Sequence, residues 1–105
     1  MTPALSVSVH VEADRTRLAL EGELDAATVA IVQDALAGAW RQPVRCVELD
    51  CTGLTFIDST GIRTFITAHL AASESGRRFV VTRLQKGPRR ILEICGVLDA
   101  LTEGG

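Results

Sequence analysis

Aromatic residues are scarce in this 105-residue chain, which contains no tyrosine, one tryptophan and three phenylalanines. Proteins that bind single-stranded nucleic acid stack bases on aromatic side chains, and nucleic-acid-binding domains usually carry a basic surplus. This chain has instead a formal net charge of -2. The basic residues between Arg77 and Arg90 therefore indicate a solvated surface, and we predict no nucleic-acid partner.

Long apolar runs are also absent, since no segment approaches the length that spans a bilayer. The first residues lack the basic and apolar regions of a secretory leader. The three cysteines, Cys46, Cys51 and Cys95, are odd in number and form no Cys-x-x-Cys pair. This pattern is typical of free thiols rather than of disulfides or a zinc site. We therefore predict a cytoplasmic protein with no membrane insertion and no bound metal.

The composition that is present belongs to an ordinary globular domain, with 47% hydrophobic and 23% charged residues. A chain of this length can enclose one hydrophobic core. We predict a single domain over residues 1–105.

Two hydrophobic periodicities divide the chain into elements. Leu5–Val11 alternates apolar with polar residues, and Leu18 and Leu20 resume the alternation after a polar break, which predicts a β-hairpin. Apolar runs predict strands over Val44–Leu49 and Phe79–Val81, and the polar residues of Asp50–Gly53 indicate a loop. Apolar spacing of 3.6 residues predicts helices over residues 28–39, 62–75 and 88–95, the last with Pro88 at its first position.

The order of these elements defines a fold class. A strand, a helix and a second strand in succession imply parallel pairing through a right-handed crossover. We therefore predict an α/β fold with a mixed, mostly parallel sheet of four to five strands and helices packed against it.

The residue patterns that mark common enzymes are missing. Ser59 lacks the Gly-x-Ser-x-Gly elbow of a hydrolase, and His69 lies ten residues further along the helix, roughly 15 Å away. The glycine-rich phosphate-binding patterns do not occur. Asp25 and Asp58 offer a pair of carboxylates, but no aromatic cleft accompanies them. We predict that the chain is not an enzyme and binds no cofactor.

Ser59 stands where the apolar segment Leu54–Ile57 meets the first turn of a helix. The first N–H groups of a helix have no internal partner, and the helix dipole concentrates positive potential there. A serine at this position can cap the helix. It can also accept a phosphate, if a kinase reaches it. The local pattern leaves both alternatives open.

Four segments of the chain resemble the STAS domain family, in particular small bacterial anti-sigma factor antagonists. The segments are Leu20–Asp25, Val47–Asp50, Phe56–Ile62 and Ile91–Val97, and they follow one another in the family's order and at matching spacings. The resemblance implies a STAS-like domain that works by partner switching.

In such a switch, the unmodified antagonist binds an anti-sigma factor with a serine-kinase fold and thereby frees a sigma factor for transcription. The kinase then phosphorylates the antagonist and the complex dissociates, and a metal-dependent serine/threonine phosphatase restores the first state. The resemblance implies that Ser59 is the phosphate acceptor, with Thr60 as a second candidate hydroxyl. It also places Asp58 beside the acceptor and Asp25 near it, as an acidic residue that supports phosphorylation or partner contact. Thr60 and Arg63 depart from the family's pattern, and Arg63, one turn beyond Ser59, can steady a phosphate or contact an acidic partner. We therefore predict a partner surface formed by Asp25, Asp58, Thr60, Gly61 and Arg63.

A second function is compatible with the same resemblance. Similar domains serve as unphosphorylated, non-catalytic subunits, for example in a lipid-transport ATPase complex or in stress-sensing assemblies. In that case Ser59 or Thr60 would lie in a permanent interface.

Overall fold

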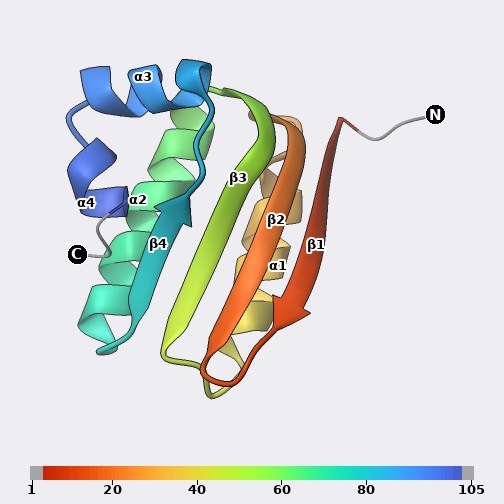
Figure 1. Cartoon of the computed structure of the whole chain (residues 1–105), viewed down its shortest axis with the longest axis vertical. Helices are drawn as coiled ribbons and strands as arrows, with labels where there is room; N and C mark the ends of the chain where they lie inside the picture. Colours follow the sequence, from red (N-terminus) through yellow and green to blue (C-terminus); the bar gives the residue numbers. More distant parts are fainter. Residues whose placement is uncertain (1–3, 103–105) are drawn as a thin grey trace.

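The computed structural model describes residues 4–102, which form one four-stranded sheet in the order β1-β2-β3-β4 (Figure 1). β1 runs antiparallel to β2, whereas β2 with β3 and β3 with β4 are parallel pairs. The elements are β1 Leu5–Val11, β2 Arg15–Leu24, α1 Val29–Trp40, β3 Cys46–Ile57, α2 Ser59–Glu74, β4 Arg78–Thr82, α3 Lys86–Ile94 and α4 Leu98–Thr102. This confirms the predicted mixed, mostly parallel sheet, with four strands in the described residues.

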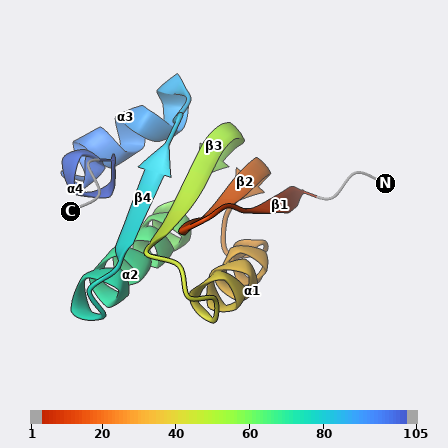
Figure 2. The ribbon, with the colours of Figure 1, turned by 60° about the horizontal axis from the view of Figure 1, so that its bottom comes forward.

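The hydrophobic core lies between the sheet and helices α1 and α2. Figure 2 shows these two helices next to each other along one face of the sheet, with α3 and α4 beyond β4. Leu18 of β2 and Leu49 of β3 are fully buried on that face, as are Val32 of α1 and Phe65 of α2. The amphipathic stripes read from the sequence are thus the buried faces of the helices.

The loop predicted at Asp50–Gly53 is wrong, because β3 continues through these residues to Ile57. Cys51 and Leu54 are fully buried, and the pairing with β2 is kept by shifts in register. Gly53 fits closely against β2, since a Cβ there would lie 2.9 Å from the Leu20 carbonyl oxygen. The glycine marks a close backbone approach inside the sheet, which sequence pattern alone does not distinguish from a loop.

The carboxyl-terminal third also differs in detail from the prediction. Pro88 is the third residue of α3, not the first, but it still lies in the first turn, where its missing N–H costs no helical hydrogen bond. Gly96 has a φ of 76°, a left-handed conformation that ends α3. The short helix α4 was not predicted, and it buries Leu98 and Leu101.

The sheet face turned away from α1 and α2 carries a network of charges. Glu48 and Asp50 alternate on β3 with the core residues, and only 8% and 5% of their surfaces are exposed. Arg15 Nη1 lies 2.7 Å from Glu48 Oε1, and Arg17 Nη1 lies 3.4 Å from Asp50 Oδ2. The Thr82 hydroxyl donates to Glu48 Oε2 at 2.7 Å. The two buried carboxylates are therefore paired and hydrogen-bonded, as burial requires.

The network decides the protonation state of both carboxylates. Burial by itself would raise the pKa of Glu48, but the hydrogen bonds from Thr82 and Arg15 outweigh it and hold this pKa below its ordinary value. Burial likewise opposes ionisation of Asp50, and hydrogen bonds from Thr52 together with nearby Arg83 lower its pKa. Both groups are thus stabilised as carboxylates in the folded state.

The fold should lose stability in mild acid because of these two groups. A folded-state pKa below the unfolded value of 4.5 for Glu48 means that its stabilisation is complete above about pH 4.5 and falls as pH drops through the folded pKa. We expect Glu48→Gln to make the thermal midpoint less dependent on pH between 7 and 3, as measured by circular dichroism. Glu74→Gln, at an exposed position outside the network, should keep the original pH profile. Identical profiles for both variants would contradict this role of Glu48.

Candidate functional site

The carboxyl-terminal ends of β2 and β3 bring predicted site residues to one end of the sheet. Leu24 and Ile57 are paired in register, and the Asp58 N–H donates to the Leu24 carbonyl oxygen at 3.2 Å. Asp25 and Asp58 each follow one member of this pair. Because α1 and α2 also begin here, the positive ends of both helix dipoles lie at this end of the sheet. The sheet thus assembles two acidic residues that lie 33 positions apart in the chain.

Asp58 is the N-cap of α2. Its Oδ1 atom accepts hydrogen bonds from the Thr60 N–H at 2.9 Å and from the Gly61 N–H at 3.2 Å. Its backbone is extended, as is usual for a residue that precedes the first helical turn. Asp58, and not Ser59, therefore caps the helix.

Ser59 is the first residue of α2, and its side chain is exposed. Its hydroxyl makes no hydrogen bond within residues 4–102, because Asp58 already occupies the nearby backbone donors. The oxygen is therefore open to solvent and is not needed to start the helix.

Asp25 organises the turn that leads into α1. Its Oδ1 atom accepts from the N–H groups of Ala27 at 2.9 Å and Thr28 at 3.2 Å, and its own N–H donates to the Thr28 hydroxyl at 3.0 Å. Thr28 is the formal N-cap of α1, but its side chain makes no capping bond. Asp25 is thus the carboxylate that precedes the cap, and it remains partly exposed.

Gly61 is buried beneath the start of α2, which explains the glycine by packing. A Cβ at this position would lie 2.7 Å from Ile57 Cγ1 and 2.8 Å from Leu24 Cγ, both of them core atoms. Helix α2 can therefore approach the paired ends of β2 and β3 only with a glycine here. A contact between Gly61 and a partner stays a prediction that this packing does not require.

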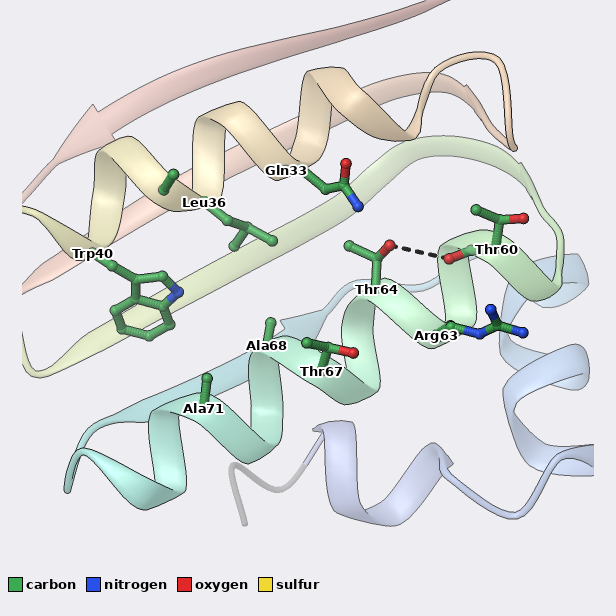
Figure 3. Close-up of a pocket in the computed structure, with 10 residues that line it drawn as sticks. Gln33, Leu36, Trp40, Thr60, Arg63, Thr64, Thr67, Ala68 and Ala71 are labelled. Carbon is green, nitrogen blue, oxygen red and sulfur yellow. Dashed lines mark hydrogen bonds between the residues drawn. The ribbon is translucent and has the colours of Figure 1, made fainter.

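Thr60 and Arg63 lie at one end of a groove between α1 and α2, with a volume of about 450 Å³. Figure 3 shows the Arg63 side chain extending toward the N-terminal end of α2, and the Thr64 hydroxyl donating to the Thr60 carbonyl oxygen at 3.1 Å. Other residues that line the groove include Gln33, Leu36 and Trp40 of α1 and Thr67 of α2. The groove starts at Thr60, the residue that follows Ser59, and continues along both helices.

Trp40 lies at the end of the groove away from Thr60 (Figure 3). The guanidinium carbon of Arg77 lies 5.2 Å from the centre of the Trp40 ring, and Arg77 Nη1 donates to the Trp40 carbonyl oxygen at 3.0 Å. A cation over an aromatic ring holds both side chains in place. The sequence analysis did not predict this groove. The signal was available in the two helical stripes that contain Gln33 and Trp40, and Thr60 and Thr67.

Two searches of the described part of the chain bear on other kinds of site. No group of three or more histidine, cysteine, aspartate or glutamate side chains within residues 4–102 is arranged to hold a metal ion. None of the four helices in this part combines the length and the apolar character of a membrane span.

Together the fold and the site define a small α/β domain that exposes a serine hydroxyl at the start of a helix, at the same end of the sheet as two acidic turns. Residues 7–103 match the family model described as "Mlab, STAS domain". The chain therefore belongs to the STAS domain family.

Individual proteins similar to this chain are named as antagonists of anti-sigma factors. An anti-sigma-B factor antagonist of Listeria monocytogenes is 25% identical over 92% of this chain and 88% of its own length. The structure of an anti-sigma factor antagonist from Mycobacterium paratuberculosis has a TM-score of 0.76 at 19% identity, over 93% of this chain and 82% of that one. Unphosphorylated SpoIIAA, also an anti-sigma factor antagonist, has a TM-score of 0.78 at 17% identity, over 92% and 85%. The structural likenesses establish a shared fold.

The packing of Gly61 can be tested with a pair of glycine-to-alanine variants. Gly61→Ala should destabilise the fold by about 1–3 kcal/mol, because the added methyl group overpacks the contact with Leu24 and Ile57. Gly38→Ala is the matched control, because Gly38 lies in the last turn of α1 and a Cβ there meets no atom of another element within 4 Å. It should stabilise the protein by about 0.5–1 kcal/mol. Urea unfolding measures both values, and equal effects of the two variants would refute the packing argument.

The assignment of the helix cap predicts different costs at neighbouring positions. Asp58→Ala should lower the free energy of unfolding by about 0.5–2 kcal/mol, because two backbone N–H groups lose their acceptor. Asp58→Asn keeps an acceptor oxygen and should cost much less. Ser59→Ala should change stability by no more than about 0.5 kcal/mol. A larger loss for Ser59→Ala than for Asp58→Ala would restore the cap to Ser59.

Proposed function

We propose that this chain is an anti-sigma factor antagonist that is regulated by phosphorylation of Ser59. In the unmodified state, the end of the sheet that contains Asp25, Asp58 and Ser59 docks on an anti-sigma factor with a serine-kinase fold, and a sigma factor is released. The partner phosphorylates Ser59 and dissociates, and a serine/threonine phosphatase restores the binding-competent state.

The observation that carries this proposal is the separation of two roles between adjacent residues. Asp58 caps α2, and Ser59 presents a solvent-exposed hydroxyl without a hydrogen bond in the described residues. A serine that capped the helix would have to break that bond before modification. Ser59 can instead be modified without any cost to the helix.

A phosphate at Ser59 would change the surface far more than the fold. The N–H groups of Thr60 and Gly61 are already bound to Asp58, so they are not available to the phosphate. The helix dipole still contributes about 0.3–1 kcal/mol of stabilisation, and Arg63 one turn further on can approach the phosphate. The modification adds roughly -1.5 to -2 charges beside Asp58, at the same end of the sheet as Asp25.

This added charge is the physical basis of the switch. A partner surface shaped for a neutral hydroxyl must desolvate the phosphate without a matching cation, which is costly. Each 1.4 kcal/mol of lost binding energy weakens the complex about tenfold. A penalty of a few kcal/mol is therefore sufficient, and no conformational change within the domain is required.

The comparisons support the proposal in two ways. The Listeria relative is named an antagonist of an anti-sigma factor and aligns with nearly the whole chain. SpoIIAA has been solved in a phosphorylated as well as an unphosphorylated form. Proteins with this fold thus include one that exists in both states that the switch requires.

The competing function is that of a non-catalytic STAS subunit in a transporter ATPase or a stress-sensing complex. There, the same end of the sheet would bind its partner permanently and Ser59 would stay unmodified. Affinity purification of the native complex followed by mass spectrometry separates the two functions. Recovery of a kinase-fold protein supports the switch, whereas recovery of a transporter ATPase supports the permanent subunit.

The switch makes a residue-specific prediction for the kinase partner recovered in this way. Incubation with that partner and ATP should add one phosphate to the wild-type chain and to Thr60→Ala, and none to Ser59→Ala, as measured by intact-protein mass spectrometry. Ser59→Asp should weaken partner binding at least about tenfold in calorimetry while leaving the melting temperature nearly unchanged. Phosphate on Thr60 of the Ser59→Ala chain, or undiminished binding by Ser59→Asp, would contradict the assignment.

A further inference from the structure

Within residues 4–102 the edge strands of the sheet are β1 and β4, and β1 differs from a protected edge strand. Leu5–Val11 contains no proline, lysine or glutamate, and its pairing with β2 runs through seven consecutive residues without a bulge. Soluble proteins normally protect such edges with charges, prolines or bulges. The exposed fractions of Val9 and Val11 are 58% and 67%, although both belong to the face that packs on the helices.

The backbone groups that β1 leaves free can be assigned from its ends. The Glu23 N–H donates to the Ala4 carbonyl oxygen, and the Glu12 N–H donates to the Arg15 carbonyl oxygen, each at 2.8 Å. In an antiparallel ladder the hydrogen-bonded positions alternate, so even-numbered residues of β1 bond to β2. The N–H and C=O groups of the odd-numbered residues therefore point outward. Those residues are Leu5, Val7, Val9 and Val11.

We infer that β1 is a self-pairing edge and that its occupant is β1 of a second copy of this chain. A two-fold axis perpendicular to the sheet, midway between the Ser8 residues of the two copies, pairs the seven residues of β1 in antiparallel order with the seven residues of β1 of the other copy. Val7 then lies opposite Val9 of the other copy, Leu5 opposite Val11, and Ser8 opposite Ser8. The outward backbone groups of the odd-numbered residues meet each other, as the ladder requires.

The side chains match in this register as well as the backbone. All apolar pairs fall on the helix-covered face, and the opposite face pairs Ser6 with His10 and Ser8 with itself, so no like charges meet. The exposed Val9 and Val11 become covered by apolar neighbours. The same patch on each copy contacts itself, which is the property of a closed two-fold interface.

Helix α1 extends the same apolar patch. Ile31 has 42% of its surface exposed. Helical spacing places it on the flank of α1 opposite to Gln33, which lines the groove with α2. α1 begins at the end of the sheet where β1 also begins (Figure 1). The proposed register brings Val11 of the second copy to this end, beside Leu5 and Ile31.

The pairing of β1 with its copy leaves the end of the sheet that contains Ser59 free, and it does not depend on the proposed function. A two-fold axis perpendicular to the sheet reverses the strand direction, so the Ser59 sites of the two copies lie at opposite ends of one continuous sheet. Two partner molecules can therefore bind without contact with β1.

Analytical ultracentrifugation of the whole chain tests the proposal. We expect a concentration-dependent monomer–dimer equilibrium. Val9→Lys places a charge opposite Val7 of the other copy and should raise the dimer dissociation constant at least about tenfold. Leu70→Lys is the matched control, because Leu70 is similarly exposed, at 55%, but lies on α2; it should leave the dimer unchanged. A wild-type chain that stays monomeric at millimolar concentration, or a dimer unaffected by Val9→Lys, would overturn the proposal.

A disulfide trap tests the register directly in a Cys95→Ser background, in which the two remaining cysteines are buried. Opposite residues of a non-hydrogen-bonded pair have Cα atoms about 4.5 Å apart, within the range of a disulfide. Ser8→Cys should therefore form a covalent dimer under mild oxidation, seen on a non-reducing gel, whereas Ser6→Cys, which faces His10, should not. Absence of a covalent dimer of the Ser8→Cys variant, or equal dimer yields from both variants, would overturn the self-pairing register.

Discussion

The parallel pairing of β2 with β3, kept as far as Leu24 and Ile57, is the constraint on which the site depends. It fixes where both strands end and therefore where Asp25 and Asp58 begin their turns. Gly61 then seats α2 directly on the last residue pair, with no room for a side chain. A slip of one residue in this register would reverse the faces of the strand and separate the two acidic turns.

The two faces of the sheet divide the tasks of stability and charge. One face forms the apolar core with α1 and α2, and the other holds Glu48 and Asp50 under the side chains of Arg15 and Arg17. Buried ion pairs add little net stability, but removal of one partner from such a pair is costly. The network therefore ties the register of three strands together, since its members come from β2, β3 and β4.

The periodic elements of the chain were predictable, and the deviations have local physical causes. Alternation and helical spacing gave the hairpin, both long helices and the mixed sheet. The sequence from Asp50 to Gly53 has the composition of a loop, yet it forms strand because burial of Cys51 and pairing with β2 override local preference. The site residues were found through the family resemblance. The cap at Asp58 needed coordinates, because aspartate and serine are equally good caps.

The capping geometry of Asp58 also bears on how fast a modified domain can be reset. A phosphate held by the backbone amides of a helix would be shielded and would have to be pulled free before hydrolysis. Here the Asp58 carboxylate already holds the amides of Thr60 and Gly61, so a phosphoryl group on Ser59 would remain in solvent. A hydrolytic enzyme could then reach it without fraying α2, and the return step would be limited by encounter rather than by local unfolding.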